Sequence, residues 1–360
     1  MSRLPVVPQS VIQGFIDTPT NIAGELSAEF GLDAPRAAAA AAALADSLGW
    51  EHRADGVAGV AGYSAADRAY IDGEYGRLWD MLTATAAPVA DSGTPKIRAT
   101  FGSPGAGKTT LLADYVSEKP DAVYLDPDER VLMNLTAYRD TIARAGDALL
   151  DNRILSDILP DTDPRHFGRM VAYTFWRGAS NYLQNNFMNA AVEGGYNIAF
   201  GTTATGAGVK FMYLENDPAK EVRGFIPQGY QASFMVVDAP VEVKTADNER
   251  RWKDGSGKFV PKKDLLGKAD LMKANFPLIP QLVAQSGGML QYFWRPCAGR
   301  PAQDVACFYK DSVSISDYRQ FAALCEANGS DAEQILRLYG NALNGQEQAP
   351  RPRSHYIPQP

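Results

Sequence analysis

The residues best suited to chemistry form one run of eight, Gly102–Thr109. The run fits the pattern G-x-x-x-x-G-K-[ST] and directly follows an apolar stretch, 97–101. Its glycines let backbone N–H groups turn inward onto phosphate oxygens, Lys108 reaches the β- and γ-phosphates, and the Thr109 hydroxyl can ligate Mg²⁺. A helix expected from Thr110 to about Val116 adds its positive N-terminal end. The run predicts a nucleotide phosphate site, with a glycine-rich structural turn as the alternative. The predicted nucleotide-binding residues are Gly102, Ser103, Pro104, Gly105, Ala106, Gly107, Lys108, Thr109 and Thr110.

Two carboxylates follow the next β-prone run. Residues 122–125 are apolar and end at Asp126-Pro127-Asp128. Carboxylates at the carboxyl end of a parallel strand face the ligand crevice of an open α/β sheet. Because an attacking hydroxyl needs a carboxylate within hydrogen-bond reach, we interpret Asp128 as the general base and Asp126 as a Mg²⁺ ligand. The alternative is that both cap the helix that follows.

A third carboxylate competes for the metal. Asp238 follows four apolar residues, 234–237, in a string that resembles a Walker B motif. If Asp238 held Mg²⁺, the chain would be closer to an NTP-hydrolysing protein than to a kinase. The string is short and common, so it carries little weight.

The densest set of positive charges begins at Lys244. It includes Arg250, Arg251 and Lys258. One interpretation is a lid whose cations close over a transferring phosphoryl group and stabilise its spreading charge. The other is a solvated helix face.

The elements around these residues predict an α/β fold. Strands that alternate with helical stretches, including a long one from 166 to 193, indicate crossover connections and a mostly parallel sheet. An edge hairpin and two closing helices, 316–327 and 330–343, are expected after it. The expected strands are 97–101, 122–125, 196–202 and 231–237, and the hairpin is formed by 289–295 and 305–309.

A helical region is expected to precede the sheet. Pro35 opens an alanine-rich helix that ends near Gly49, and Ser64 begins another helix with a capping-box pattern. The second helix has one apolar face, which either packs on the next domain or binds a partner such as an inhibitor protein. That face consists of Ile71, Tyr75, Leu78 and Leu82. The expected division is a helical region over 1–94, a nucleotide-binding domain over 95–310, C-terminal helices over 311–348 and a proline-rich tail over 349–360.

Composition narrows the class of protein. The chain has 360 residues and a formal net charge of −7, which argues against a general nucleic-acid binder. Three cysteines without CxxC spacing and three histidines suggest neither a disulfide framework nor a zinc site. No secretory signal or membrane span is apparent. The expected location is therefore the cytoplasm, although an address read by a secretion system would not be visible.

The order of these motifs resembles the zeta toxin family of kinases. The loop 102–110 resembles the family's GQPGSGKTS, 124–128 resembles its I-D-N-D, and 195–198 matches its G-Y-N-L. The register places Arg251 and Lys258 on the family's two lid arginines. The similarity covers about residues 95–310. Further matches, to the family's G-Y, A-V-P, I-E-R-Y and T-P-K, are Gly229-Tyr230, Ala239-Pro240, Glu249-Arg250-Arg251-Trp252 and Val260-Pro261-Lys262.

The resemblance implies a P-loop kinase-type fold and an activity. The activity is ATP- or GTP-dependent, Mg²⁺-dependent phosphorylation of a hydroxyl on a nucleotide-type metabolite, toxic to the target cell and subject to an antitoxin or other inhibitor protein. The usual family acceptor is UDP-N-acetylglucosamine, whereas related effector kinases of plant pathogens, delivered into a host cell, phosphorylate NAD.

This chain departs from the family at the acceptor side. The family's V-I-E-G-T is replaced by 199–203, Ala-Phe-Gly-Thr-Thr, which lacks the sugar-binding Glu. Loss of one buried acceptor should cost about 1–3 kcal/mol of sugar binding. Both acceptors stay open, with the NAD-type reading slightly ahead. The polar groups expected around the acceptor, each with a structural cap as its alternative, are Thr202, Thr203 and Asn181.

Two rival functions come from other classes. One is an NTP-hydrolysing switch that acts on a partner through residues 1–94. The other is a nucleotide-binding interaction module without kinase activity, which the missing Glu would suit. A polynucleotide kinase fits less well, because the chain is acidic and does not interleave aromatic and basic residues.

Overall fold

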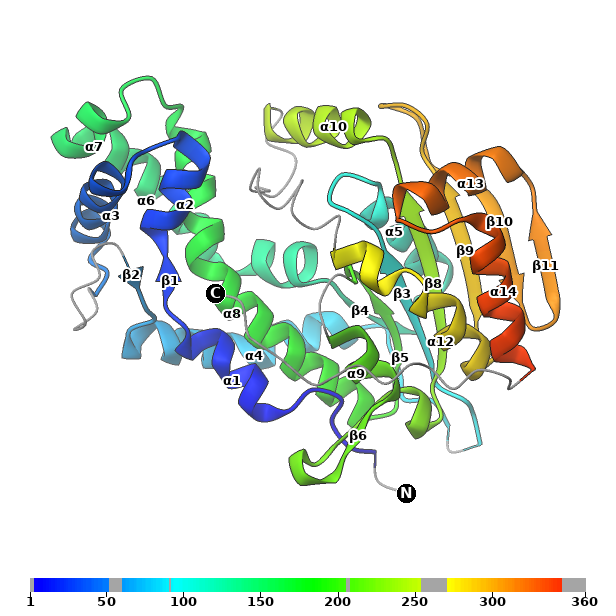
Figure 1. Cartoon of the computed structure of the whole chain (residues 1–360). Coiled ribbons are helices and arrows are strands. Elements are labelled where there is room, and N and C mark those ends of the chain that lie inside the picture. The colour runs from blue at the N-terminus through cyan, green and yellow to red at the C-terminus, as the bar shows by residue number, and fades with distance from the viewer. Residues whose placement is uncertain (1–2, 52–59, 91, 205–207, 254–270, 345–360) are drawn as a thin grey trace.

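A seven-stranded sheet forms the centre of the C-terminal two-thirds of the chain (Figure 1). The computed structural model describes residues 3–51, 60–90, 92–204, 208–253 and 271–344. The strand order is β11-β10-β9-β8-β3-β5-β4. The strands are β3 (Lys96–Phe101), β4 (Ala122–Leu125), β5 (Asn197–Phe200), β8 (Gln231–Asp238), β9 (Met289–Trp294), β10 (Gln303–Tyr309) and β11 (Ser312–Ile315).

The sheet is mostly parallel, as the sequence predicts. The pairs β4–β5, β5–β3, β3–β8 and β8–β9 are parallel, and β9–β10 and β10–β11 are antiparallel. The chain begins the sheet at β3, places β4 and β5 on one side and then crosses to β8 and β9 on the other. Connections leaving a strand in opposite directions open a crevice at its carboxyl end, which here is the end of β3. The expected α/β class is therefore confirmed.

Alternating side chains give the sheet two covered faces. On β4, Val123 and Leu125 join the main core, whereas Ala122 and Tyr124 face a smaller cluster with Leu112 of helix α5 (Lys108–Glu118). This period of two is the mark of a strand buried on both sides. The main-core face of β8 and β9 packs against α12 (Leu278–Ser286) and α13 (Tyr318–Ala327).

Helices of the N-terminal half surround one long central helix (Figure 1). Helix α8 (Pro164–Glu193) is buried along much of its length and packs against α1, α2, α4 and α6. One continuous hydrophobic core runs from these helices into the sheet. The surrounding helices are α1 (Gln9–Asp17), α2 (Ile22–Phe30), α3 (Ala34–Leu48), α4 (Ala65–Thr83), α6 (Thr136–Asp151) and α7 (Arg153–Ile158).

The two predicted N-terminal helices form where their end signals lie. Helix α3 follows an Asp33 N-cap and ends at Gly49, whose φ of 69° is left-handed. Helix α4 begins with the predicted capping box at Ser64. Its apolar face points inward, since Ile71, Leu78 and Leu82 are buried and Tyr75 lies 5.0 Å from Phe187 of α8. This face packs inside the molecule and is not a partner surface.

Other parts of the chain differ from the expectation or lie outside the description. The sequence reading did not anticipate α6, α7 or β11, and the expected tail, 349–360, lies outside the described residues. No helix in the described part of the chain combines the length and apolarity needed to cross a bilayer. The remaining elements are β1 (Thr20–Asn21), β2 (Val60–Ala61), α9 (Gly208–Leu214), β6 (Asn216–Asp217), β7 (Val222–Arg223), α10 (Val241–Lys253) and α14 (Ala332–Leu343).

Two glycines within helices lie in opposite surroundings, one at a crowded helix crossing and one in open space. A Cβ on Gly168 would lie 2.2 Å from the Ile142 carbonyl oxygen, where α8 meets α6, whereas a Cβ on Gly73 of α4 would meet no atom within 4 Å. We expect Gly168→Ala to lower the free energy of unfolding by about 1–3 kcal/mol through overpacking. Gly73→Ala should raise it by about 0.5–1 kcal/mol through helix propensity. Urea denaturation measures both; equal effects would contradict the close crossing of α6 and α8.

Candidate active site

The phosphate-binding loop is a turn that only glycine can make. It joins β3 to α5, and Gly105 and Gly107 have φ values of 81° and 109°. A Cβ on Gly102 would lie 2.2 Å from the Val237 carbonyl oxygen. The three glycines are therefore required by the backbone path itself. A loop of this kind, leading into a helix N-terminus, presents backbone N–H groups to an anion.

Two side chains of this loop have the chemistry that nucleotide binding requires. The Lys108 ammonium lies over the loop and donates to the Ser103 carbonyl oxygen at 2.8 Å. Thr109 is half-buried in the first turn of α5. This glycine cradle with one hydroxyl fits a nucleoside triphosphate and a Mg²⁺ ion, which takes oxygen ligands and keeps several waters. The described residues include no group of three or more His, Cys, Asp or Glu side chains that could hold a metal alone.

The Asp238 carboxylate at the end of β8 is a structural hub. Its Oδ1 accepts from the Ser103 hydroxyl at 3.0 Å, the Ala239 N–H at 2.8 Å and the Lys244 ammonium at 2.8 Å. Its Oδ2 accepts from the Asn328 amide at 3.1 Å. These donors use most of the lone pairs of the carboxylate. The arrangement favours a structural role for Asp238 over a metal site.

Helix α10 is fixed against the phosphate-binding loop at its first turns. The Arg295 guanidinium pairs with Asp247 of α10 and donates to the Gly105 carbonyl oxygen at 3.1 Å. A Cβ on Gly105 would lie 2.8 Å from the Lys244 carbonyl oxygen of the same helix. The end of α10 nearest the glycine loop is thus held in place from two sides.

The predicted lid cations begin at the far end of this helix. The exposed Arg250 lies 3.8 Å from Asp247, measured between Nε and Oδ1. Arg251 is in the last turn of α10, and Lys258 lies outside the described residues. Their convergence over the loop therefore stays a prediction.

The carboxylates of Asp126 and Asp128 have different hydrogen-bond partners. The Asp126 Oδ1 accepts from the N–H groups of Asp128 and Glu129, both at 2.9 Å, and so caps the turn that follows β4. Its Oδ2 lies against Gly201 at the end of β5, where a Cβ would be 2.2 Å away. The buried Asp128 carboxylate accepts from the Arg177 guanidinium of α8. The capping alternative is therefore observed for Asp126, and its metal role stays a prediction.

Sequence reasoning missed the residues of α8 that hold this turn. Arg177 contacts Asp128, and the Ser180 hydroxyl donates to the Pro127 carbonyl oxygen. Their spacing of three places both on one helix face. Polar residues on the buried face of a long helix were the available signal, but the sequence alone did not say which face was buried.

The predicted acceptor-side residues lie at the end of β5 and on α8. The Thr100 hydroxyl donates to the Thr202 carbonyl oxygen at 2.8 Å and accepts from the Thr202 N–H at 2.9 Å. The Thr202 hydroxyl accepts from the Ala204 N–H at 3.0 Å, so it serves partly as a structural cap. Thr203 follows in the same loop, and Asn181 is half-buried beside Ser180. Their contact with an acceptor stays a prediction.

One cavity lies at this edge of the sheet and another lies away from it. A cavity of about 100 Å³ lies at the end of β5, with Thr202, Tyr213 and Phe234 among its lining. It is smaller than the ~150 Å³ cavity that holds benzene.

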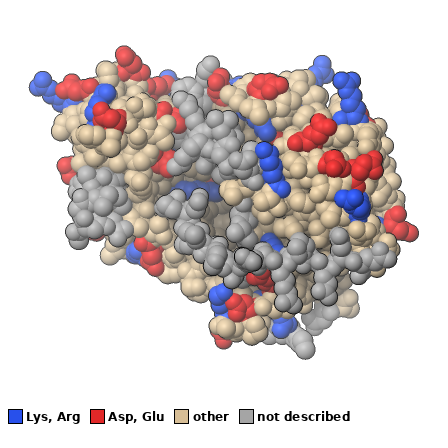
Figure 2. Space-filling view, viewed as in Figure 1, with Lys and Arg blue, Asp and Glu red and all other residues tan. Residues whose placement is uncertain are grey.

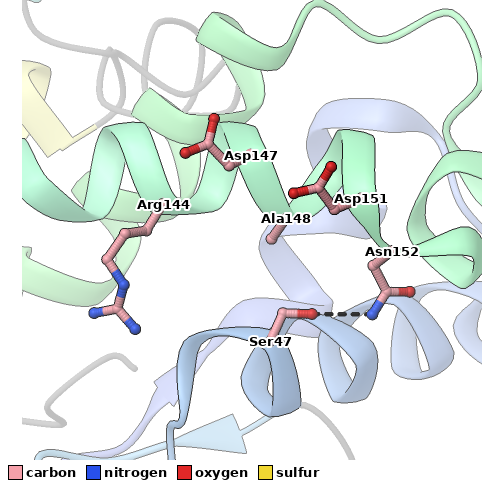
Figure 3. Close-up of a pocket in the computed structure, with 6 residues that line it drawn as sticks. All are labelled: Ser47, Arg144, Asp147, Ala148, Asp151 and Asn152. Carbon is pink, nitrogen blue, oxygen red and sulfur yellow. Dashed lines mark hydrogen bonds between the residues drawn. The ribbon is translucent and has the colours of Figure 1, made fainter.

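A second cavity, of about 340 Å³, lies between α3 and α6, where Asn152 donates to the Ser47 hydroxyl at 2.9 Å (Figure 3). Because no residue of the phosphate-binding loop lines it, we assign it no part in the site. Its lining is Ser47, Arg144, Asp147, Ala148, Asp151 and Asn152.

The surface around the site is uneven in charge. In the space-filling view, Lys and Arg side chains are seen in and beside the hollow between the N-terminal helices and the sheet, and Asp and Glu side chains lie on the surfaces to both sides of it (Figure 2). A hollow lined in part by cations raises the local concentration of anionic ligands such as nucleotides.

Fold and site together define a P-loop α/β protein, in which residues 102–110, Asp126, Asp128 and Thr202 gather at the carboxyl ends of three neighbouring strands. No family model matches this chain, and no curated protein matches it.

Solved structures are similar to the chain at low identity. One is a chain from the PezAT chromosomal toxin-antitoxin system of Streptococcus pneumoniae, with 14% identity, a TM-score of 0.42 and coverage of 79% of this chain and 97% of that chain. Another is a chain of the AvrRxo1-ORF1:-ORF2 complex with ATP, with 12% identity, a TM-score of 0.46 and coverage of 79% and 86%. The fold itself rests on the strand order and the loop.

Removing the charge of Asp238 should destabilise the folded protein. Asp238→Asn leaves the Lys244 ammonium without its anion in a buried place, and we expect a loss of about 3–5 kcal/mol in the free energy of unfolding. As a matched control, Asp217→Asn removes the partner of the exposed Lys220, 2.7 Å away, and should change stability by less than about 1 kcal/mol. Chemical denaturation of both variants checks this; similar losses would mean that Asp238 is no hub.

Proposed function

We propose that the protein is a P-loop kinase that transfers the γ-phosphoryl group of ATP or GTP to a hydroxyl of a nucleotide-type metabolite. One observation carries the proposal: the buried Asp128 carboxylate and the Lys108 loop lie at the same edge of the sheet, at the ends of β4 and β3 with only β5 between them. Phosphoryl transfer requires a base for the acceptor hydroxyl beside a cation-lined phosphate site.

Each residue of the site has one task in this reaction. The loop N–H groups and Lys108 bind the β- and γ-phosphates, and Thr109 holds Mg²⁺, which neutralises charge on the phosphate oxygens. Asp128 orients the acceptor hydroxyl and takes its proton. Arg251 and Lys258, with Arg250, stabilise the transferring group from the end of α10.

The acceptor side supports a nucleotide-linked metabolite, either NAD or UDP-N-acetylglucosamine. Gly201 stands where the resembled family carries its sugar-binding Glu, and the Asp126 Oδ2 lies against that glycine. A carboxylate oxygen is thus present at this place from a neighbouring strand. With Thr202, Thr203 and Asn181 it can bind acceptor hydroxyls.

By the same resemblance, we propose that the activity is toxic to a target cell, within the cytoplasm or after delivery as an effector, and is restrained by an antitoxin-like protein.

A labelling experiment tests the function. The protein is incubated with γ-labelled ATP, Mg²⁺ and either NAD, UDP-N-acetylglucosamine or an extract of small metabolites, and labelled species are identified by mass spectrometry. We expect a phosphorylated metabolite. Release of inorganic phosphate at the same rate with and without metabolites would indicate an NTP-hydrolysing switch, and neither product would indicate a binding module.

Removal of the base should separate chemistry from binding. Asp128→Asn keeps the shape of the side chain and a hydrogen bond to Arg177 but cannot take a proton. We expect transfer to fall by about two to four orders of magnitude, with the Kd for ATP unchanged. The matched control is Asp114→Asn on the exposed face of α5, which should keep wild-type turnover. Isothermal titration and single-turnover kinetics measure both; full activity of the Asp128 variant would remove it from its role.

A further inference from the structure

A tyrosine hydroxyl from the N-terminal region is inserted into helix α8. The Tyr63 hydroxyl accepts from the Ala179 N–H at 2.8 Å and donates to the Phe175 carbonyl oxygen. In a regular helix these two backbone groups bond to each other, because they are four residues apart. A side chain inserted in this ladder is a recognised cause of local helix distortion. Burial raises the pKa of the Tyr63 hydroxyl, so it keeps the proton that it donates.

The N-terminal region reaches this turn of α8 from a second side. A Cβ on Gly178 would lie 2.5 Å from the Phe15 carbonyl oxygen of α1 and 3.1 Å from the Tyr63 hydroxyl. Tyr63 itself follows β2, which pairs with β1 through Thr20 and Ala61. The turn 175–179 is therefore clamped by two separate segments of the N-terminal region.

The same turn carries the partner of the proposed base. Arg177 lies between Phe175 and Ala179, and its guanidinium is bonded to the Asp128 carboxylate. The guanidinium also lies 5.7 Å from the centre of the Tyr173 ring, measured from Cζ. One turn further, Ser180 holds the Pro127 carbonyl oxygen. A shift of this turn would consequently move these two contacts of α8 with the loop bearing Asp128.

We propose that Arg177 is a positioning residue for Asp128, and that Tyr63 sets the position of Arg177 by its insertion into α8. The inference rests on the proposed kinase function, in which Asp128 must lie within reach of the acceptor hydroxyl. Misplacement of a catalytic group by about 1 Å can reduce the rate about 10²-fold. The N-terminal helices thereby act on the reaction without touching a substrate.

A matched pair of tyrosine variants tests the link. Tyr63→Phe removes the inserted hydroxyl. Tyr70→Phe removes a hydroxyl of the same N-terminal region that also accepts one backbone N–H, from Ala137 at 3.2 Å, but on α6 rather than α8. We expect Tyr63→Phe to lower kcat at least tenfold with the KM for ATP unchanged, and Tyr70→Phe to keep kcat within twofold. Equal effects of the two changes would overturn the proposal.

Hydrogen exchange gives a second readout that needs no enzymatic activity. Amides of 175–180, followed by mass spectrometry on the full chain, should exchange faster in Tyr63→Phe than in the wild type or in Tyr70→Phe. If no metabolite is phosphorylated by the wild type, the proposed function fails while exchange still decides the link. Unchanged exchange in Tyr63→Phe would remove the link whatever the activity.

Arg177 is tested by a conservative and a disruptive change. Arg177→Met removes the charge and should lower kcat at least tenfold, with the Kd for ATP unchanged. Arg177→Lys keeps the positive charge but not the planar fork, and we expect it to restore part of the loss. Equal turnover of both variants with the wild type would show that Asp128 needs no support from α8.

Discussion

A single buried carboxylate joins the glycine loop to the elements packed around it. Asp238 binds the phosphate-binding loop through Ser103, helix α10 through Lys244 and the end of α13 through Asn328, and its carbonyl oxygen accepts from the Arg295 N–H at 3.1 Å. A charge without partners in such a place would be costly, but here each donor offsets part of the lost hydration. The glycine loop, the first turns of α10 and the end of α13 are consequently held in one geometry.

The two ends of the proposed reaction are supported by different halves of the chain. The phosphate side depends on contacts within the sheet and its C-terminal helices, through Asp238 and Arg295. The acceptor side depends on α8, which receives the Tyr63 hydroxyl on one face and presents Arg177 to Asp128 on another. Because one hydrophobic core connects both halves, the N-terminal helices pack as one body with the sheet.

The ends of β4 and β5 meet at Gly201. Gly201 has no side chain, and the Asp126 carboxylate from β4 fills the space that a side chain there would occupy. In a parallel sheet the carboxyl ends of adjacent strands are close enough for such an exchange. The carboxylate from β4 therefore places negative charge at the end of β5, whose own residue there has no side chain.

The local elements followed from sequence because their signals are local: the glycine loop, the Ser64 capping box and the alternating strands depend on residues close together in the chain. The mostly parallel sheet and the loop at the end of β3 were also predicted. Helices α6 and α7 and the pairing of Arg177 with Asp128 were not. These depend on which face of α8 is buried and what lies against it, and a contact between residues 49 apart has no sequence period. The residue types by themselves determined the glycine loop and the strand and helix signals around it. Only the tertiary structure decided which side chains hold Asp128 and Asp238, because those partners are brought together by packing and not by spacing.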